Sequence, residues 1–381
     1  MTNQYALTGD QLAIQDMARK FTADAITPFA AEWDVTKHFP VDVIKRSAQL
    51  GFGGIYVREA SGGIGLGRLE AAIIMEAMAY GCPATSAFIS IHNMAAWMID
   101  SFASDDIKSR YLPDLITMDK IASYCLTEPG SGSDAAALKT TARRDGDDYV
   151  VSGSKQFISG AGVNDIYVCM MRTGEDGPRG ISCLLVEKDM PGLSFGAPEK
   201  KLGWNASPTA QVHFDNVRVP AANRIGGEGE GFRIAMAGLD GGRINIGACS
   251  LGGAQRCLDE AVAYTKERKQ FGQAIADFQN TQFMLADMAT DLEAARALLY
   301  IAACKVTDNA PDKSRFSAMA KRLATDNGSK IVNDALQLFG GYGYLQDYPI
   351  ERFWRDLRVH SILEGTNQVM RMIVGRDLLR Q

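Results

Sequence analysis

The chain has 381 residues, of which 46% are hydrophobic and 22% charged, a composition typical of a folded protein with two or three domains. Its formal net charge of −5 gives no support to nucleic-acid binding, which usually requires a basic face or tract. The seven cysteines are odd in number and form no CxxC pair, so we predict reduced, structurally buried thiols in a reducing compartment.

Targeting and membrane signals are not found in the sequence. The first ten residues contain neither a positive run with an apolar core nor an Arg-rich amphipathic leader, and no apolar run reaches about 18 residues. These features predict a cytoplasmic protein of bacterial type without stable membrane insertion. A processed eukaryotic form would instead lie in the mitochondrial matrix.

The first third of the chain, residues 1–121, is predicted to be a helical domain. Thr8 with Gln11 three residues later matches a capping box at a helix start. Apolar residues then follow at helical spacing: Ile14, Met17, Ala18, Phe21 and Ala25. Pro28 and Pro40 are expected to interrupt the helices.

Residues 122–223 are predicted to form a β domain, because the hydrophobic period changes to two. Examples are the series Ile166, Val168 and Met170, and the pair Val212 and Phe214 with polar residues between and around them. Turn signals at residues 145–147, 174–178 and 191–192 separate strands at intervals that suit a small barrel or sandwich.

Residues 224–381 return to a helical pattern. A stripe at alternating spacings of three and four predicts an antiparallel bundle or an oligomer interface: Leu285, Met288, Leu292, Ala295, Leu299, Ala302 and Val306. The order helical, β, helical predicts an α+β chain whose β module is inserted between helical parts.

The segment Tyr124–Asp134, at the entry of the β domain, combines hydroxyls, glycines and acids. Glycines let a backbone approach closely, and hydroxyls with free N–H groups donate to a ring carbonyl or a pyrophosphate. The segment has neither the GxxxxGK of a P-loop nor the strand-linked GxGxxG of a dinucleotide fold. A ligand-wrapping loop and a plain turn both remain open.

Three further motifs allow a structural or a functional interpretation. Phe157 and Ser159 share a strand face and suit a flat heterocycle, although a strand Phe is also a common core residue. The basic pair Arg268 and Lys269 ends a helix and is either a phosphate contact or a solvated terminus. A helix C-cap explains Gly340 or Gly341, but not the whole Leu336–Tyr344 run.

Glu364 is an isolated carboxylate beside Ile362 and Leu363, just before a predicted C-terminal helix. Glu prefers water, so apolar neighbours require either a surface position or a chemical reason. An ordinary charge at a helix start capped by Gly365 and Thr366 is one interpretation, and a general base is the other.

Together, the motifs YCLTEPGSGSD, KQFISGAG, RKQFG, QLFGGYGY and ILEGTNQVMR, in this order, resemble the acyl-CoA dehydrogenase family of flavoproteins over essentially the whole chain. The resemblance implies an N-terminal helical domain, a middle β-barrel domain and a C-terminal four-helix bundle, assembled as a homotetramer. It also implies FAD as cofactor, an acyl-CoA substrate, electron-transfer flavoprotein as acceptor, and no metal.

Carried over by motif position, the resemblance implies that Glu364 is the catalytic base and that its backbone N–H helps to hold the thioester carbonyl. The implied FAD contacts, some from a neighbouring subunit, are Tyr124, Leu126, Thr127, Ser133, Phe157, Ser159, Arg268, Gln270, Phe271, Gln279, Gln337, Gly341, Thr366 and Gln368. The implied substrate contacts are Ser133, Asp240, Arg243 and Gly365.

The resemblance also bears on the substrate. Some family members carry the base at the position of Gly242, which has no side chain to act as one. Phe157 stands where many straight-chain members have Trp, and Leu363 where many have Tyr, which is similar to short branched-chain members.

The expected reaction is therefore α,β-dehydrogenation of isobutyryl-CoA to methacrylyl-CoA in valine breakdown, with proton removal by Glu364 and hydride transfer to flavin. 2-Methylbutyryl-CoA and butyryl-CoA are alternative substrates, because one methylene changes binding by only about 1–3 kcal/mol. An acyl-CoA oxidase and a non-catalytic acyl-CoA-binding protein are the alternatives from other classes.

Overall fold

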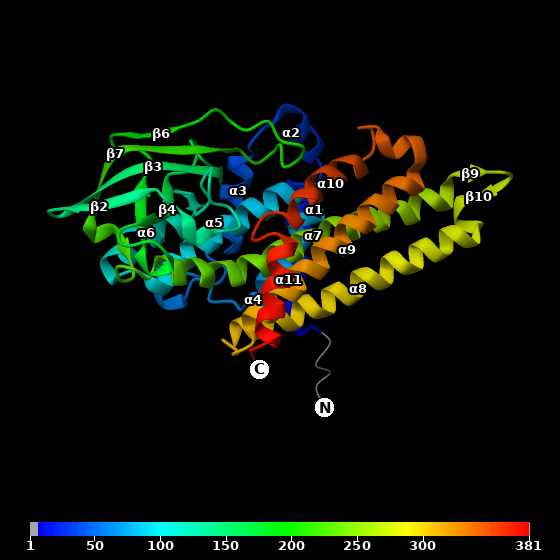
Figure 1. Ribbon diagram of the computed structural model, residues 1–381. Helices are drawn as coiled ribbons and strands as arrows, with labels where there is room; N and C mark the ends of the chain where they lie inside the picture. The colour runs from blue at the N-terminus through cyan, green and yellow to red at the C-terminus, as the bar shows by residue number, and fades with distance from the viewer. Residues whose placement is uncertain (1–6, 381) are drawn as a thin grey trace.

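The computed structural model describes residues 7–380 and has a helical, β, helical order along the chain (Figure 1). The predicted α+β class and the predicted order of a helical, a β and a second helical part are confirmed. The N-terminal helices are α1 (Gly9–Ala25), α2 (Ala30–Thr36), α3 (Val41–Ser47), α4 (Arg68–Ala79), α5 (Pro83–Phe102) and α6 (Asp105–Ile116). The expectation about a leader concerns mainly residues 1–6, which lie outside the described residues.

The start of α1 follows the sequence signal closely. Gln11 N donates to Thr8 Oγ1 at 3.2 Å, and Thr8 N donates to Gln11 Oε1 at 3.0 Å, so the predicted capping box is confirmed. Phe21 and Ala25 are buried against the core. The helix ends before Pro28, and Pro40 directly precedes α3, because proline cannot continue a helix from inside.

The β domain is one bent sheet with strand order β6-β7-β3-β2-β4-β5-β8, and β1 is added in parallel to β4. The strands are β1 (Ala122–Cys125), β2 (Thr141–Asp145), β3 (Asp148–Ser159), β4 (Ile166–Arg172), β5 (Ile181–Glu187), β6 (Leu193–Phe195), β7 (Thr209–Pro220) and β8 (Arg224–Ile225). Only one residue pair, Thr141 with Arg172, joins β2 to β4, so the two halves fold over a shared core. The predicted domain limits at residues 121 and 223 stay predictions.

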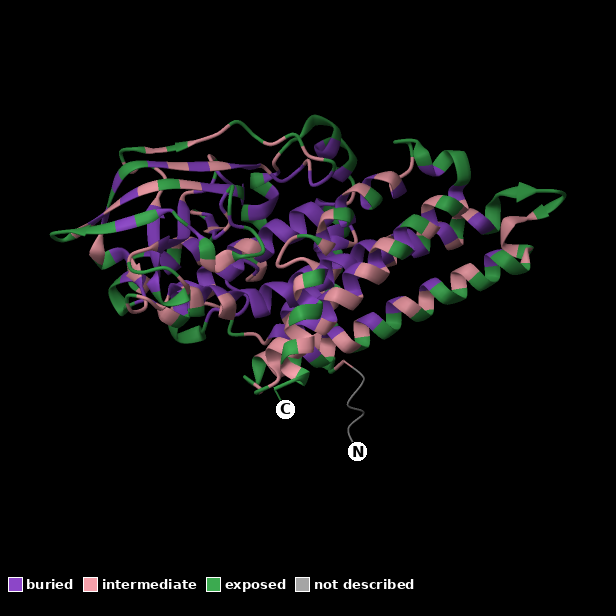
Figure 2. Ribbon diagram, in the orientation of Figure 1, coloured by how far each residue is buried: buried purple, intermediate pink, exposed green. Residues whose placement is uncertain are grey.

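Strand β4 shows what its period of two means. Ile166, Val168 and Met170 pack on a core shared with α5 and α6, whereas the alternate residues of β4 pack inside the bent sheet. Both faces of β4 are buried, as Figure 2 also shows. The alternation therefore predicts which residues of β4 share a face, but not that one face is exposed. Strand β4 lies between the helical core and the core inside the sheet.

The C-terminal part is a bundle of long helices that reaches away from the β domain (Figure 1). Its elements are α7 (Gly231–Glu267), β9 (Lys269–Gln270), β10 (Gln273–Ala274), α8 (Gln279–Thr307), α9 (Lys313–Phe339), α10 (Ile350–Leu357) and α11 (Asn367–Leu378). The predicted stripe on α8 is confirmed, with Met288, Leu292 and Leu299 buried and Leu285 packed beside them. Among the helices described, none has both the length and the apolarity to span a bilayer.

All seven cysteines are free, and six are buried. The prediction of burial is wrong for Cys304, which is exposed. Its neighbours Ala302 and Ala303 occupy the packed face of α8. Cys304 lies on the opposite, outward face of α8, because only one face of this helix packs against the bundle.

Candidate active site

Glu364 lies in a tight turn between the short 3-10 helix Arg358–Ser361 and α11. Glu364 and Gly365 both adopt left-handed backbone angles, with φ of 56° and 89°. A left-handed conformation costs a non-glycine residue roughly 1–2 kcal/mol, so the turn is held by its surroundings. Thr366 then caps α11, since Val369 N donates to its Oγ1 at 3.3 Å.

The turn points the Glu364 carboxylate at Gly242 on α7. A methyl group added at Gly242 would lie 2.5 Å from Glu364 Oε2 and 3.2 Å from Met94 Sδ of α5. The glycine therefore leaves room for the carboxylate. The two alternative base positions of the family pattern thus face the same small space, and only Glu364 brings an acid to it.

The Glu364 carboxylate is poorly solvated, because one of its two oxygens is buried. Its Oε2 is buried and has no hydrogen-bond partner among residues 7–380, although the residue as a whole is partly exposed. Burial raises the pKa of Glu364 to about 7, and the charges of Arg243 and Lys321 oppose this rise. A carboxyl group that titrates near neutral pH suits a general base.

The Tyr124 hydroxyl of β1 is a second buried polar atom for which the described chain offers no partner. Burial is the main cause that raises its pKa, and the charge of Glu364 is the next, which puts both groups in one region. Most buried polar atoms in proteins are paired, so two orphaned oxygens here indicate a place for a polar ligand.

Strand β1 is fixed to helix α5 by His92, which the sequence analysis did not single out. Ala122 N donates to His92 Nδ1 at 3.1 Å, so the other ring nitrogen carries the proton and donates to Leu115 O at 2.9 Å. Burial lowers the pKa of His92 to about 4, which keeps the ring neutral at physiological pH. Tyr124 is thereby anchored to the helix that carries Met94.

The Tyr124–Asp134 segment and the strand with Phe157 are tied together. Gln156 N donates to Thr127 O at 2.8 Å, and the buried Lys155 donates to Leu126 O at 3.2 Å and to Glu128 Oε1 at 2.7 Å. Glu128 and Lys155 were also missed from the sequence. Their buried ion pair holds the segment in position.

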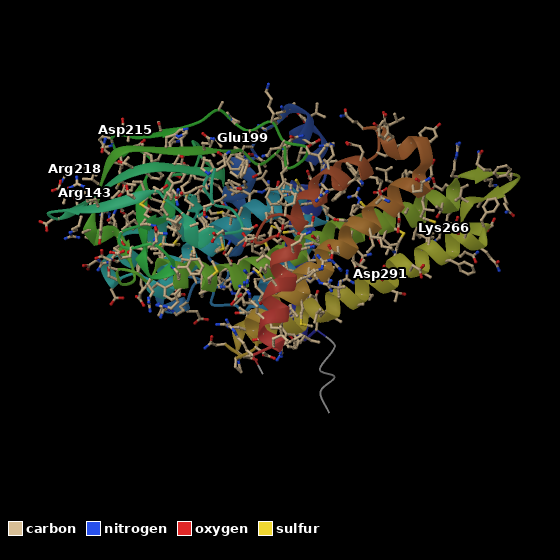
Figure 3. The ribbon with its side chains drawn as sticks, viewed as in Figure 1. Arg143, Glu199, Asp215, Arg218, Lys266 and Asp291 are labelled. Atoms are coloured by element: carbon tan, nitrogen blue, oxygen red, sulfur yellow. The ribbon has the colours of Figure 1, made fainter. Side chains whose placement is uncertain are left out.

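Phe157 is not a core residue. It sits at a break in the β3–β7 register with φ of 58°, and 64% of it is exposed. Bulges beside functional sites commonly re-aim a side chain, and this one turns the ring outward while Ile158 stays buried. The next residue but one, Ser159, is half-buried, and Ser133 is exposed. Gln156, inside the bulge, also donates from its side chain to Glu199, which is labelled in Figure 3.

These residues fit FAD. An outward aromatic ring, an orphaned Tyr124 hydroxyl and half-buried Thr127 suit the face and edge of a flat heterocycle. The loop glycines Gly130 and Gly132 have open space on the side where a Cβ would project. The loop can therefore approach a large ligand closely.

The predicted substrate contacts Asp240 and Arg243 lie beneath the turn. Arg243 Nη1 pairs with Asp240 Oδ1 at 2.8 Å, and Arg243 Nε donates to Glu364 O at 3.4 Å. Ser314 Oγ donates to Asp240 Oδ2 at 2.5 Å. Both charged residues are buried, so Arg243 supports the Glu364 turn directly, and its contact with substrate stays a prediction.

Two other basic residues near the site were missed. Lys321 of α9 is fully buried, and its spacing from the buried residues Ser317 and Ala324 on the same helix was the available signal. Arg68 of α4 lies over the ring of Tyr56 at 3.6 Å from guanidinium carbon to ring centroid. Its Nη1 is buried without a partner in the part of the chain described.

Most of the remaining predicted FAD contacts lie at the far end of the bundle. The β9–β10 hairpin projects there, well apart from α11 (Figure 1), and its Phe271 is 95% exposed. A groove of about 450 Å³ is lined there by Arg268, Gln270 and Gly341. Gln279 begins α8, Gln337 lies in the last turn of α9, and both are exposed. Thr366 and Gln368 stay beside Glu364. One chain therefore brings together only part of the predicted set.

Comparison with known proteins identifies relatives for every part of the chain. Three models match in succession: acyl-CoA dehydrogenase N-terminal domain over residues 8–119, middle domain over residues 123–217 and C-terminal domain over residues 229–379. A mitochondrial isobutyryl-CoA dehydrogenase of Dictyostelium discoideum is 57% identical over 373 residues, covering 98% of this chain and 90% of that protein. The Bos taurus protein of the same name is 54% identical over 375 residues, with the same coverage.

Solved structures agree over nearly the full length. Butyryl-CoA dehydrogenase from Megasphaera elsdenii has a TM-score of 0.96 at 37% identity, covering 99% of this chain and 100% of that chain. PigA with FAD and proline has a TM-score of 0.96 at 31% identity with the same coverage. A chain described as electron transferring flavoprotein of Acidaminococcus fermentans has a TM-score of 0.97 at 42% identity, again with that coverage.

Proposed function

Because the chain belongs to the acyl-CoA dehydrogenase family, we propose that it oxidises isobutyryl-CoA to methacrylyl-CoA, with Glu364 as the base. The chain is an oxidoreductase, and its relatives support dehydrogenation of a short branched-chain acyl-CoA. The observation that carries the proposal is the buried Glu364 carboxylate, which has a pKa of about 7 and lies over Gly242.

FAD is the cofactor, and when bound it supplies the acceptor for the hydride that leaves the substrate β-carbon. Tyr124, Leu126, Thr127 and Phe157 are the residues of this chain that we assign to the flavin end. The orphaned Tyr124 hydroxyl and the outward Phe157 ring support that assignment.

Glu364 removes the α-proton in its ionised form. An α-proton beside a thioester is only weakly acidic, so the base needs raised basicity and the carbonyl oxygen needs a donor. Burial provides the first requirement, since it raises the pKa of Glu364 to about 7. We assign the backbone N–H of Glu364 to the second. The protonated carboxyl is then neutral, which suits the buried position of its Oε2.

Isobutyryl-CoA is the preferred substrate in this proposal because the relatives at 57% and 54% identity carry that name, whereas the butyryl-CoA enzyme is 37% identical. A role in valine breakdown follows from that substrate. The 42% identical chain described as electron transferring flavoprotein supports such a protein as electron acceptor. The cytoplasmic or mitochondrial location stays a prediction.

A homotetramer is also part of the proposal. Arg268, Gln270 and Phe271 lie at the tip of the bundle, away from Glu364, and Phe271 is almost fully exposed. A neighbouring subunit is a natural occupant of that tip, where these residues would complete the FAD site of the second copy.

The test is reduction of the purified flavoprotein under anaerobic conditions by isobutyryl-CoA, butyryl-CoA and 2-methylbutyryl-CoA separately. Loss of the oxidised-flavin absorbance is the measurement, and isobutyryl-CoA is expected to give the fastest loss. Faster reduction by another of the three would reassign the substrate. Reduction by none would refute the proposed activity.

A further inference from the structure

Lys321 is a fully buried lysine in the middle of α9. Its Nζ donates to Gly365 O at 2.8 Å and to Asn367 Oδ1 at 2.9 Å, and both acceptors are neutral. A buried ammonium group is costly unless a carboxylate compensates its charge. The residue that compensates Lys321 is therefore to be sought among the acids around the Glu364 turn.

The neighbouring carboxylates already have cationic or amide partners, with one exception. Asp240 pairs with Arg243 at 2.8 Å. Asp326 accepts from Asn367 Nδ2 at 2.6 Å and from Arg371 at 3.5 Å. Glu364 Oε2 is buried and has no hydrogen-bond partner within residues 7–380. Glu364 is thus the acid of this group with an unpaired buried oxygen, and it directly precedes the glycine whose carbonyl Lys321 binds.

The charges of the two groups act on each other. Burial lowers the pKa of Lys321 to about 8, and Glu364 is the first cause that opposes this. Lys321 in turn opposes the rise of the Glu364 pKa, after Arg243. The other titratable and charged groups around this pair come from α7, α9, β1, the 3-10 helix before the turn and the segment before α4: Arg243 with its partner Asp240, Asp326, Tyr124, His360 and Tyr56. Burial lowers the pKa of His360 to about 3, so that ring stays neutral.

The backbone contact gives Lys321 a second effect. Its acceptor is the carbonyl of Gly365, the residue directly after Glu364. Gly365 has φ of 89°, and Arg243 Nε donates to the carbonyl of the preceding residue, Glu364, at 3.4 Å. Arg243 of α7 and Lys321 of α9 therefore donate hydrogen bonds to two consecutive carbonyl groups of the strained turn.

We propose that Lys321 is a positioning residue for catalysis: it fixes the left-handed turn that holds the Glu364 carboxylate over Gly242, and its positive charge favours the ionised form of that carboxylate. This inference rests on the proposed role of Glu364 as base. Lys321 acts through Glu364 and needs no contact with the substrate.

The test substitutes Lys321→Met, which keeps an unbranched chain in the buried space and removes the charge and the donors. The first readout is the pH dependence of kcat/KM for isobutyryl-CoA. Its acidic limb is expected to move up by about one pH unit, the low end for loss of an opposite charge. The pH-independent value of kcat/KM is also expected to fall about tenfold, because the turn loses one of its two hydrogen bonds from cationic side chains.

The second readout needs no turnover. Infrared titration of the Glu364 carboxyl in substrate-free holoenzyme, identified by difference from Glu364→Gln, reports its protonation directly. The same upward shift is expected in Lys321→Met. If Glu364→Gln turned over normally, the proposed base would be wrong, but this titration would still decide whether Lys321 and Glu364 are coupled.

Lys330→Met is the matched control on the same helix. Lys330 is 52% exposed and pairs with Asp291 of α8 at 3.0 Å, and Asp291 is labelled in Figure 3. This variant is expected to keep the wild-type pH profile and carboxyl titration. Lys321→Arg keeps the charge and should keep the position of the acidic limb even where the pH-independent value of kcat/KM falls.

Lys321→Gln covers the case in which Lys321→Met does not fold. It removes the charge but keeps a polar N–H donor for the neutral acceptors Gly365 O and Asn367 Oδ1. The acidic limb is again expected to move upward. The proposal would be overturned if the folded variants kept both the wild-type acidic limb of kcat/KM and the wild-type titration of the Glu364 carboxyl. It would also be overturned if Lys321→Met lost rate while its pH profile stayed in place.

Discussion

Replacing Gly242 by Ala tests whether the position of the Glu364 carboxylate controls the rate. The added methyl would lie 2.5 Å from Glu364 Oε2, 3.1 Å from its Cδ and 3.2 Å from Met94 Sδ, so the carboxylate must shift by roughly 1 Å to reach ordinary van der Waals distance. A displacement of about 1 Å in a reacting group lowers rates about 10²-fold. That loss corresponds to about 2.7 kcal/mol of transition-state stabilisation.

The fold is expected to survive this change. Alanine is favoured over glycine inside a helix by about 1 kcal/mol, and overpacking in a buried site costs about 1–3 kcal/mol. The net loss of stability is therefore at most about 2 kcal/mol. The assay is the rate of anaerobic flavin reduction by isobutyryl-CoA, with thermal unfolding measured on the same samples.

Gly375→Ala is the control for the effect of a methyl on a helical glycine. Gly375 lies in α11, and nothing comes within 4 Å of its added Cβ. This variant should be about 0.4–1 kcal/mol more stable, with an unchanged rate. A rate for folded Gly242→Ala within about twofold of the wild type would refute the steric reasoning, because a 10²-fold loss is expected.

Four further predictions concern the base, its effect on stability with pH, the flavin contact and the assembly. Glu364→Gln should retain yellow FAD but lose at least about 10²-fold in flavin reduction rate, and near-normal turnover would contradict its role. Since folding raises the pKa of Glu364 from 4.5 to about 7, the folded state binds its proton more tightly, and stability falls as pH rises through that window. Denaturant titrations should therefore show Glu364→Gln gaining stability over the wild type as pH increases from 4.5 to 7, and a constant difference would argue against the raised pKa. Phe157→Ala should change the unfolding free energy by less than about 0.5 kcal/mol, because the ring is exposed. The variant should nevertheless lose FAD faster than the wild type on dialysis. Equal FAD retention would show that Phe157 is not part of the cofactor site. Phe271→Asp should reduce the assembly size in light scattering and weaken FAD retention together, whereas an unaltered assembly would place the subunit interface elsewhere.

Local features of the fold were predictable from the sequence because their causes lie within a few residues. The capping box of Thr8 and Gln11 needs only neighbouring backbone groups, and the stripe on α8 needs only helical periodicity. Glu364 was also recognisable from its motif and apolar neighbours. The turn residues Gly365 and Thr366 follow the same local rules.

Other features depended on packing that no local pattern contains. Phe157 was a possible core residue in the strand pattern, and only the bulge against β7 turns it outward. Cys304 was expected to be buried and is exposed, because one face of α8 has no neighbour within the described chain. The period of two in β4 assigned its faces correctly but gave no sign that both are covered.

The sequence by itself determined the order of elements, the family and the identity of the acid at residue 364, since hydrogen bonds along the chain, side-chain periodicity and motif composition are all local or linear properties. Only the tertiary structure decided what surrounds that acid. Gly242 and Lys321 approach it from two other helices, more than 40 positions away along the chain. Burial, which raises the pKa of Glu364, exists only once these distant segments pack together and exclude water.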